Sequence, residues 1–187
     1  MPRATRPPIA PLVPIAPIAP RSPKSPNAAR PLATRLVAKE PSPKPSLTSA
    51  TAFVVDASVS AAWLLRDEST PFTDAALHAT ATADVWVPAL WLLEMANLLH
   101  SAQHRGRIDG DKRAELAAAA GGLRLQVCRE PVTLPALDAL AAEHGLTAYD
   151  ACYLELALRR RLPLATLDRA LLAAMRKSGV ALAALPG

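Results

Sequence analysis

Short apolar runs alternate with longer segments of helical spacing from residue 51 to the end of the chain. An apolar run without polar alternation is typical of a strand buried on both faces, whereas apolar residues at every third or fourth position indicate a helix. The runs predict strands at 52–56, 84–88, 123–128, 162–167 and, more briefly, 180–185. The spacing predicts helices at about 58–68, 70–83, 89–105, 109–121, 133–143, 147–160 and 168–177.

Strands that alternate with helices, without hairpin signals between them, predict a parallel sheet flanked by helices. We therefore expect residues 51–187 to form one α/β domain, a three-layer α/β/α sandwich around a central, mostly parallel sheet. A chain of 187 residues has room for one such domain and a tail. Ligands of such folds bind beyond the carboxyl ends of the strands.

Residues 1–50 differ in composition from the rest of the chain. They hold 13 of the 19 prolines, eight of the 21 basic residues and a single acidic residue, whereas the remainder holds 13 basic and 15 acidic residues. The proline spacing favours an extended polyproline II conformation over a core. We expect a disordered basic tail or a misassigned start; a third interpretation is a basic arm that tethers the protein to RNA or another polyanion.

Cysteine content and hydropathy restrict the class of protein further. Cys128 and Cys152 have no pair spacing, so they predict neither a zinc site nor a disulfide scaffold, which fits a reducing compartment. No apolar run reaches the roughly 18 residues that a membrane span needs, and prolines interrupt the apolar stretch near the N-terminus that superficially looks like a signal peptide. We expect a cytoplasmic protein with no membrane segment.

Four acidic residues stand at the mouth or in the first turns of predicted helices, among apolar neighbours: Asp56, Glu94, Asp150 and Asp168. The position of Asp56, Glu94 and Asp168 after strands predicts that these three share one edge of the sheet, while topology alone does not place Asp150. At about 4 Å and an effective dielectric of ~20, each like-charge pair would cost roughly 4 kcal/mol. A divalent cation reverses that sign, and carboxylate and water ligands suit Mg²⁺ or Mn²⁺.

Every acid except Glu94 has an alternative role as part of a helix cap. Aspartate after a strand is a favoured N-cap, which suits Asp56 and Asp168, and the segment 147–150 matches a capping-box pattern. Glu94 lies inside its helix on an otherwise apolar face, where a carboxylate needs a partner, and Asn97 supplies another polar group on the same stripe. Because capping does not explain Glu94, the set favours a shared site.

Other side chains give weaker signals. The four histidines have no metal-ligand spacing with the acids, and the chain has neither a glycine-rich phosphate loop nor a serine nucleophile elbow. Tyr149, Tyr153 and the three tryptophans are expected in the core rather than as stacking platforms.

Residues 52–187 resemble the PIN domain, and within it the VapC-type ribonuclease toxins of bacterial and archaeal toxin–antitoxin pairs. The segments that carry the resemblance are, in order, VVDASV, the Glu94-x-x-Asn97 helix, LTAYDACYLELAL and LATLDRAL. The resemblance implies a Mg²⁺- or Mn²⁺-dependent ribonuclease, and it alone adds Asp150 to the acidic constellation. Thr166 and Asn97 match polar positions of the family's site.

The resemblance also implies hydrolysis of RNA by metal-activated water, a homodimer, and a small antitoxin that inserts a segment near the acidic pocket. Two alternatives stay open. One is a PIN-scaffold protein that only binds RNA or a partner, which the presence of all four acids argues against. The other is a different α/β metal phosphohydrolase acting on small phosphate esters, which the missing phosphate loop makes less favourable.

Overall fold

The computed structural model describes residues 52–185, so the predictions about residues 1–50 lie outside the described residues. Four parallel strands form the sheet, in the order β3-β2-β1-β4. Their bounds are β1 (Ala52–Val55), β2 (Asp84–Pro88), β3 (Leu125–Cys128) and β4 (Leu164–Ala165). The predicted parallel sheet is thus confirmed.

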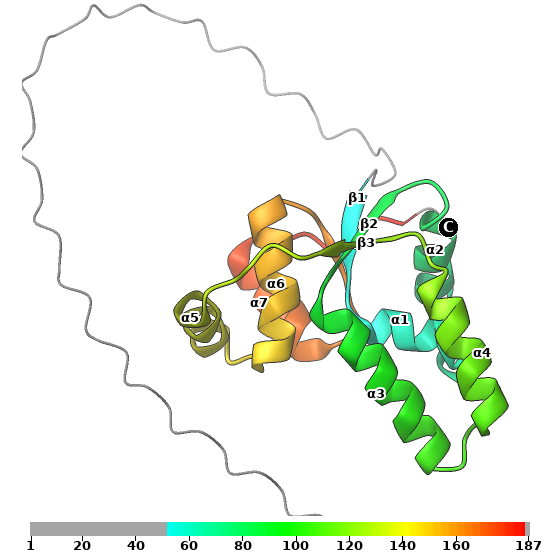
Figure 1. Ribbon diagram of the computed structural model, residues 1–187. Coiled ribbons are helices and arrows are strands. Elements are labelled where there is room, and N and C mark those ends of the chain that lie inside the picture. Colours follow the sequence, from blue (N-terminus) through cyan, green and yellow to red (C-terminus); the bar gives the residue numbers. More distant parts are fainter. Residues whose placement is uncertain (1–51, 186–187) are drawn as a thin grey trace, which may run out of the picture. The chain divides into compact units, whose positions relative to one another are not determined.

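Helices cover the sheet on both sides, which confirms the three-layer α/β/α fold (Figure 1). One side carries α1 (Ala57–Leu64), α2 (Pro71–Ala79), α3 (Leu90–His104) and α4 (Gly110–Gly121), and the other carries α5 (Leu134–His144), α6 (Ala148–Arg160) and α7 (Arg169–Ser178). Successive strand residues point to opposite faces. Accordingly, Phe53 and Val55 belong to the apolar cluster that includes α1 and α3, while Val54 belongs to the cluster that includes α6 and α7.

Four predicted elements are much shorter than the sequence pattern indicated, and one of them is the strand expected at 162–167, which is reduced to β4. The helix expected at 58–68 ends at Leu64, because Leu65 leaves the helical conformation, and a separate 3₁₀ turn, η1 (Arg66–Glu68), follows. The helix expected at 70–83 ends at Ala79, where the Thr80 hydroxyl donates to the carbonyl of Leu77 at 2.7 Å.

The strand expected at 180–185 is reduced to a single parallel bridge between Leu164 and Leu182. Its partner β4 is only two residues long, so it offers few backbone groups for a longer ladder. Among the described residues, no helix is both long and apolar enough to cross a bilayer.

The sheet register and one buried hydrogen-bond chain bring the beginnings of three helices together. Val55 of β1 pairs with Ala165 of β4, so the residues that follow these strands start side by side. The Trp91 indole donates to Ser60 Oγ at 2.9 Å, and Ser60 Oγ donates to the carbonyl of Asp56 at 3.2 Å. The start of α3 is therefore tied to the start of α1.

Candidate active site

Asp56 is a buried carboxylate held by several donors. It caps α1, with Oδ1 accepting from the backbone N–H of Ala57 at 2.7 Å. Its Oδ2 accepts from the hydroxyls of Ser58 at 2.5 Å and Thr166 at 2.8 Å. Burial raises the pKa of Asp56 above its ordinary value, and the hydrogen bonds from Ser58 and Thr166 act in the opposite direction. The surroundings therefore fix the orientation of this carboxylate.

Glu94 is half-buried on α3, and its partner lies on a different helix. The buried Tyr153 hydroxyl of α6 donates to Glu94 Oε2, whereas Asn97, the neighbour expected from the sequence, is exposed one turn along α3. Burial raises the pKa of Glu94; the bond from Tyr153 lowers it, and the charges of Asp56 and Asp150 raise it further. Asp56, Glu94 and Asp150 thus share one electrostatic environment.

Asp150 and Asp168 both take part in helix capping. The Thr147 hydroxyl donates to Asp150 Oδ2 at 2.7 Å and accepts from the backbone N–H of Asp150 at 3.1 Å. Asp168 caps α7, accepting from the N–H of Leu171 at 2.7 Å, and its own N–H donates to Thr166 Oγ1 at 3.0 Å. Capping leaves these acids able to interact with the others: Thr166 bonds to both Asp56 and Asp168, and the charge of Asp150 contributes to raising the pKa of Glu94.

Two residues, Ser58 and Tyr153, hold the acids by hydrogen bonds that were not predicted from the sequence. Ser58 donates to Asp56 and also accepts from the N–H of Leu167 at 3.0 Å, which ties α1 to the connection between β4 and α7. Tyr153 is in the core, as expected, but its hydroxyl also holds Glu94. The spacing of Asp150 and Tyr153, three residues apart on one helix, is the sequence signal that could have pointed to the second role.

The four acids differ from most other carboxylates of the domain in lacking a basic partner. Within residues 52–185, no Lys, Arg or His side-chain nitrogen lies within 4 Å of a carboxylate oxygen of Asp56, Glu94, Asp150 or Asp168. The acids that do pair with arginine or lysine are Asp67, Glu68, Asp74, Glu115, Glu130 and Glu155. The site thus combines uncompensated negative charge with oxygen donors.

These donors fit a hard divalent cation in kind, because Mg²⁺ and Mn²⁺ favour carboxylate, hydroxyl and water oxygens. In the described part of the chain, however, no three His, Cys, Asp or Glu side chains are already arranged to hold a metal ion. Asp56 and Asp150 accept from hydroxyls and Glu94 accepts from Tyr153. Ligation of one ion by three of these groups therefore requires side-chain rotation.

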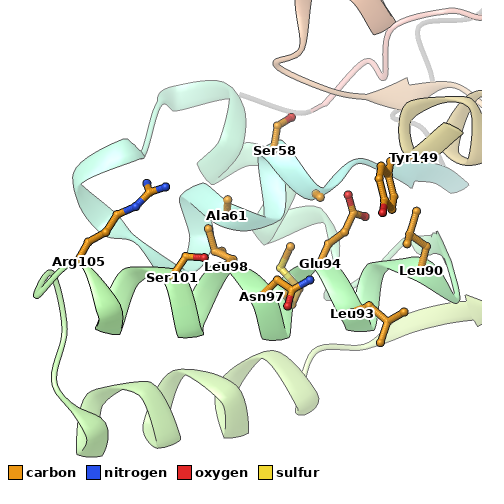
Figure 2. A pocket seen from close by; sticks show the side chains of 12 residues that line it. Ser58, Ala61, Leu90, Leu93, Glu94, Asn97, Leu98, Ser101, Arg105 and Tyr149 are labelled. Atoms are coloured by element: carbon orange, nitrogen blue, oxygen red, sulfur yellow. The ribbon is translucent and has the colours of Figure 1, made fainter. Parts of the chain in front are cut away.

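A groove with a volume of about 680 Å³ is lined by Glu94 and by Ala57 and Tyr149, the chain neighbours of Asp56 and Asp150 (Figure 2). Its walls come from α1 and α3, and Tyr149 from the first turn of α6 closes one end. Tyr149 is 60% exposed, so the expectation that it lies in the core was wrong. Ala148 beside it is also exposed, and burial in α6 begins only at Ala151, with Tyr153 and Leu154 following.

Comparison with known proteins agrees with the fold. The model of one protein family, the PIN domain, matches residues 53–177. Among solved structures, the crystal structure of PAE2754 from Pyrobaculum aerophilum is similar, with a TM-score of 0.53 and 26% sequence identity, over 69% of this chain and 87% of that chain. No curated protein matches the chain. The family match extends from β1 to α7 and agrees with the parallel α/β/α architecture, so the chain belongs to the PIN domain family, whose members are generally nucleases.

Proposed function

We propose that this protein is a Mg²⁺- or Mn²⁺-dependent ribonuclease that hydrolyses RNA phosphodiester bonds. The observation that carries the proposal is that Asp56, Glu94 and Asp150 have no basic partner within residues 52–185, while Thr166 and Ser58 hold Asp56 and Tyr153 holds Glu94. Burial raises the pKa of Glu94, and the charges of Asp56 and Asp150 raise it further. Uncompensated carboxylates beyond the carboxyl ends of parallel strands are suited to binding a cation where a phosphate ester can reach it.

Asp56 is the first ligand in this proposal and Asp150 the second, with Glu94 and Asp168 binding directly, through water or to a second ion. A bound ion would supply an activated water and stabilise charge on the phosphate. The chain's own groups prepare the ligands: Thr166 and Ser58 orient Asp56, and Tyr153 orients Glu94. Thr166 also contacts the backbone of Asp168, so it fixes two acids relative to each other.

The proposal extends to the biological setting that the family resemblance implies. We propose a VapC-type toxin of a type II toxin–antitoxin pair, acting as a cytoplasmic homodimer and neutralised by a small antitoxin. Two free cysteines, Cys128 and Cys152, are compatible with a reducing compartment. Expression with and without a small adjacent gene that encodes a DNA-binding protein tests this part: growth arrest that the neighbour relieves supports it, and growth unaffected by the protein contradicts it.

The nuclease proposal is tested by incubating structured RNA with the protein and its Asp56→Asn variant, with and without Mg²⁺ or Mn²⁺. The wild type should cleave only with metal, and Asp56→Asn should lose roughly 100-fold or more in rate, the scale seen when a group that stabilises transition-state charge is removed. The matched control is Asp138→Asn, which makes the same charge change on the exposed surface of α5 and should leave the rate unchanged.

Each other outcome identifies a different function or site. Absence of cleavage with any metal, together with intact RNA binding, supports a binding-only PIN scaffold. Turnover of small phosphate esters without cleavage of RNA supports the alternative phosphohydrolase. Equal cleavage by Asp56→Asn and the wild type would show that the acids have been assigned wrongly.

A further inference from the structure

A row of polar residues follows one face of α3 away from the acids. Glu94, Asn97, Ser101 and Arg105 recur at intervals of three and four residues, so they lie on the same face of the helix. All four line the groove between α1 and α3 (Figure 2). Glu94 is half-buried, whereas Asn97, Ser101 and Arg105 are exposed, so a ligand in the groove can reach their polar groups.

Arg105 stands at the far end of this row. It follows the last residue of α3, 11 residues after Glu94, which corresponds to about 16 Å at a rise of about 1.5 Å per residue. Its side chain is exposed and, within residues 52–185, joins no ion pair, whereas Arg107 is bound by Asp67 and Glu68, each at 2.8 Å. Figure 2 shows the Arg105 guanidinium reaching from the end of α3 toward the α1 side of the groove.

Tyr149 stands at the opposite end, beside Glu94 (Figure 2). It directly precedes Asp150, and 60% of it is exposed although it is aromatic. Leu90 and the exposed Leu93 of α3 line the same groove. An exposed ring in this position offers a stacking surface for an unpaired base, a contact that single-stranded nucleic acid makes with every base type.

We propose that the groove is the track of a single RNA strand: Tyr149 stacks on a base next to the cleaved phosphodiester, and Arg105 holds a backbone phosphate several nucleotides away. The inference rests on the proposed ribonuclease function. It adds the path of the strand, from the acids to Arg105, and requires a substrate long enough to span that path. Asn97 and Ser101, between the two ends, supply the uncharged donors that proteins commonly use on phosphate and sugar. Glu94 lies at one end of the groove and Arg105 at the other, with apolar side chains such as Ala61, Met95 and Leu98 along its length. This lining suits a single strand whose bases and sugars pack on the apolar side chains and whose cleaved bond lies at the acidic end.

The track is tested by measuring RNA affinity in the full-length protein with Asp56→Asn as a non-cleaving background. In that background, Tyr149→Ala should weaken binding of a long single-stranded RNA by about 5- to 140-fold, the range for loss of one base–aromatic stack, without changing the salt dependence. Tyr149→Trp should retain binding, because the ring and not the hydroxyl is used. Leu134→Ala, which removes an exposed apolar side chain on α5, is the matched control and should leave affinity unchanged.

Arg105→Ala should instead change the salt dependence. Loss of one phosphate contact should reduce the slope of log affinity against log salt by about 0.7 for single-stranded RNA. The matched control is Arg176→Ala, which removes the same charge from the exposed surface of α7. With RNA shortened until it no longer reaches Arg105, the Arg105→Ala effect should vanish while the Tyr149→Ala effect remains. In the cleaving protein, Arg105→Ala should raise KM for long RNA and leave kcat close to that of the wild type.

The outcomes separate this inference from the function on which it rests. If the wild type cleaves RNA but Tyr149→Ala and Arg105→Ala bind RNA like their controls, the track is wrong and the ribonuclease proposal stands. The same holds if a peptide segment binds in the groove and leaves the affinity for RNA unchanged. If no RNA is cleaved but both variants weaken binding as described, the track stands and the ribonuclease fails. If Arg105→Ala still changed the salt dependence of affinity for an RNA too short to reach Arg105, the proposed path of the strand would also be wrong.

Discussion

Replacing Tyr153 with phenylalanine removes the donor that holds the Glu94 carboxylate. Tyr153 is fully buried, so the ring keeps its packing and only the hydroxyl is lost. Glu94 is half-buried and is repelled by the charges of Asp56 and Asp150. Loss of a hydrogen bond to a charged group destabilises a protein by about 1.5–3 kcal/mol. At about 4 °C per kcal/mol for a domain of this size, the Tm at neutral pH should fall by roughly 6–12 °C.

The effect of Tyr153→Phe depends on pH in a defined direction. Burial raises the pKa of Glu94 in the folded protein, so the wild type loses stability as pH rises from the unfolded value near ~4.3 through the folded pKa. The Tyr153 bond favours the ionised form and limits this loss. In the variant the folded pKa of Glu94 is higher still, so the loss continues to higher pH. The two proteins should therefore differ little in acid and most at neutral pH.

Urea unfolding at pH 4 and pH 7 of the wild type, Tyr153→Phe, Glu94→Gln and the double variant measures this coupling. Glu94→Gln keeps an acceptor for the hydroxyl but no charge, so Tyr153→Phe in that background should cost only about 0.5–1.5 kcal/mol, independently of pH. Equal penalties for Tyr153→Phe in the Glu and Gln backgrounds at both pH values would refute the reasoning, because the bond would then not depend on the charge of Glu94.

Two further predictions concern Asp56. Thr166→Val removes the hydroxyl that donates to Asp56 and accepts from the Asp168 N–H, so urea unfolding should show a loss of about 1–3 kcal/mol in stability. The pKa of Asp56 should rise in a carboxyl-resolved NMR titration, because a hydrogen bond to its charged form is lost. An unchanged pKa would contradict the assigned bond. Asp56→Asn removes a buried charge, so without metal the stability of the variant relative to the wild type should increase as pH rises from about 4 through the raised folded pKa of Asp56. Mg²⁺ should raise the Tm of the wild type but not that of the variant. Equal Tm shifts with Mg²⁺ would argue against Asp56 as a ligand.

Much of the fold follows from local sequence signals. The parallel strand runs, the long helix after Pro88 and the ends of α5 and α6 lie within a few residues of their expected positions. These features depend on burial periodicity, proline, and local hydrogen bonds such as the Thr147 cap of α6 and the left-handed Gly145 after α5. The last strand was overestimated because an apolar run does not reveal how long its partner strand will be.

Part of the candidate site could likewise be predicted from the sequence, and part depended on the tertiary structure. The carboxyl ends of parallel strands meet at one edge of a sheet, so the sequence by itself predicted that Asp56, Glu94 and Asp168 share that edge. The pairing of β1 with β4, which starts the segments of Asp56 and Asp168 side by side, came from the tertiary structure. Only the tertiary structure decided that Tyr153, 59 residues from Glu94, is its partner and that Tyr149 is exposed at the groove. Backbone preferences and the spacing of buried residues depend on neighbouring residues in the sequence. Contacts between distant side chains depend on how two helices pack against one sheet, which no single segment of the chain determines.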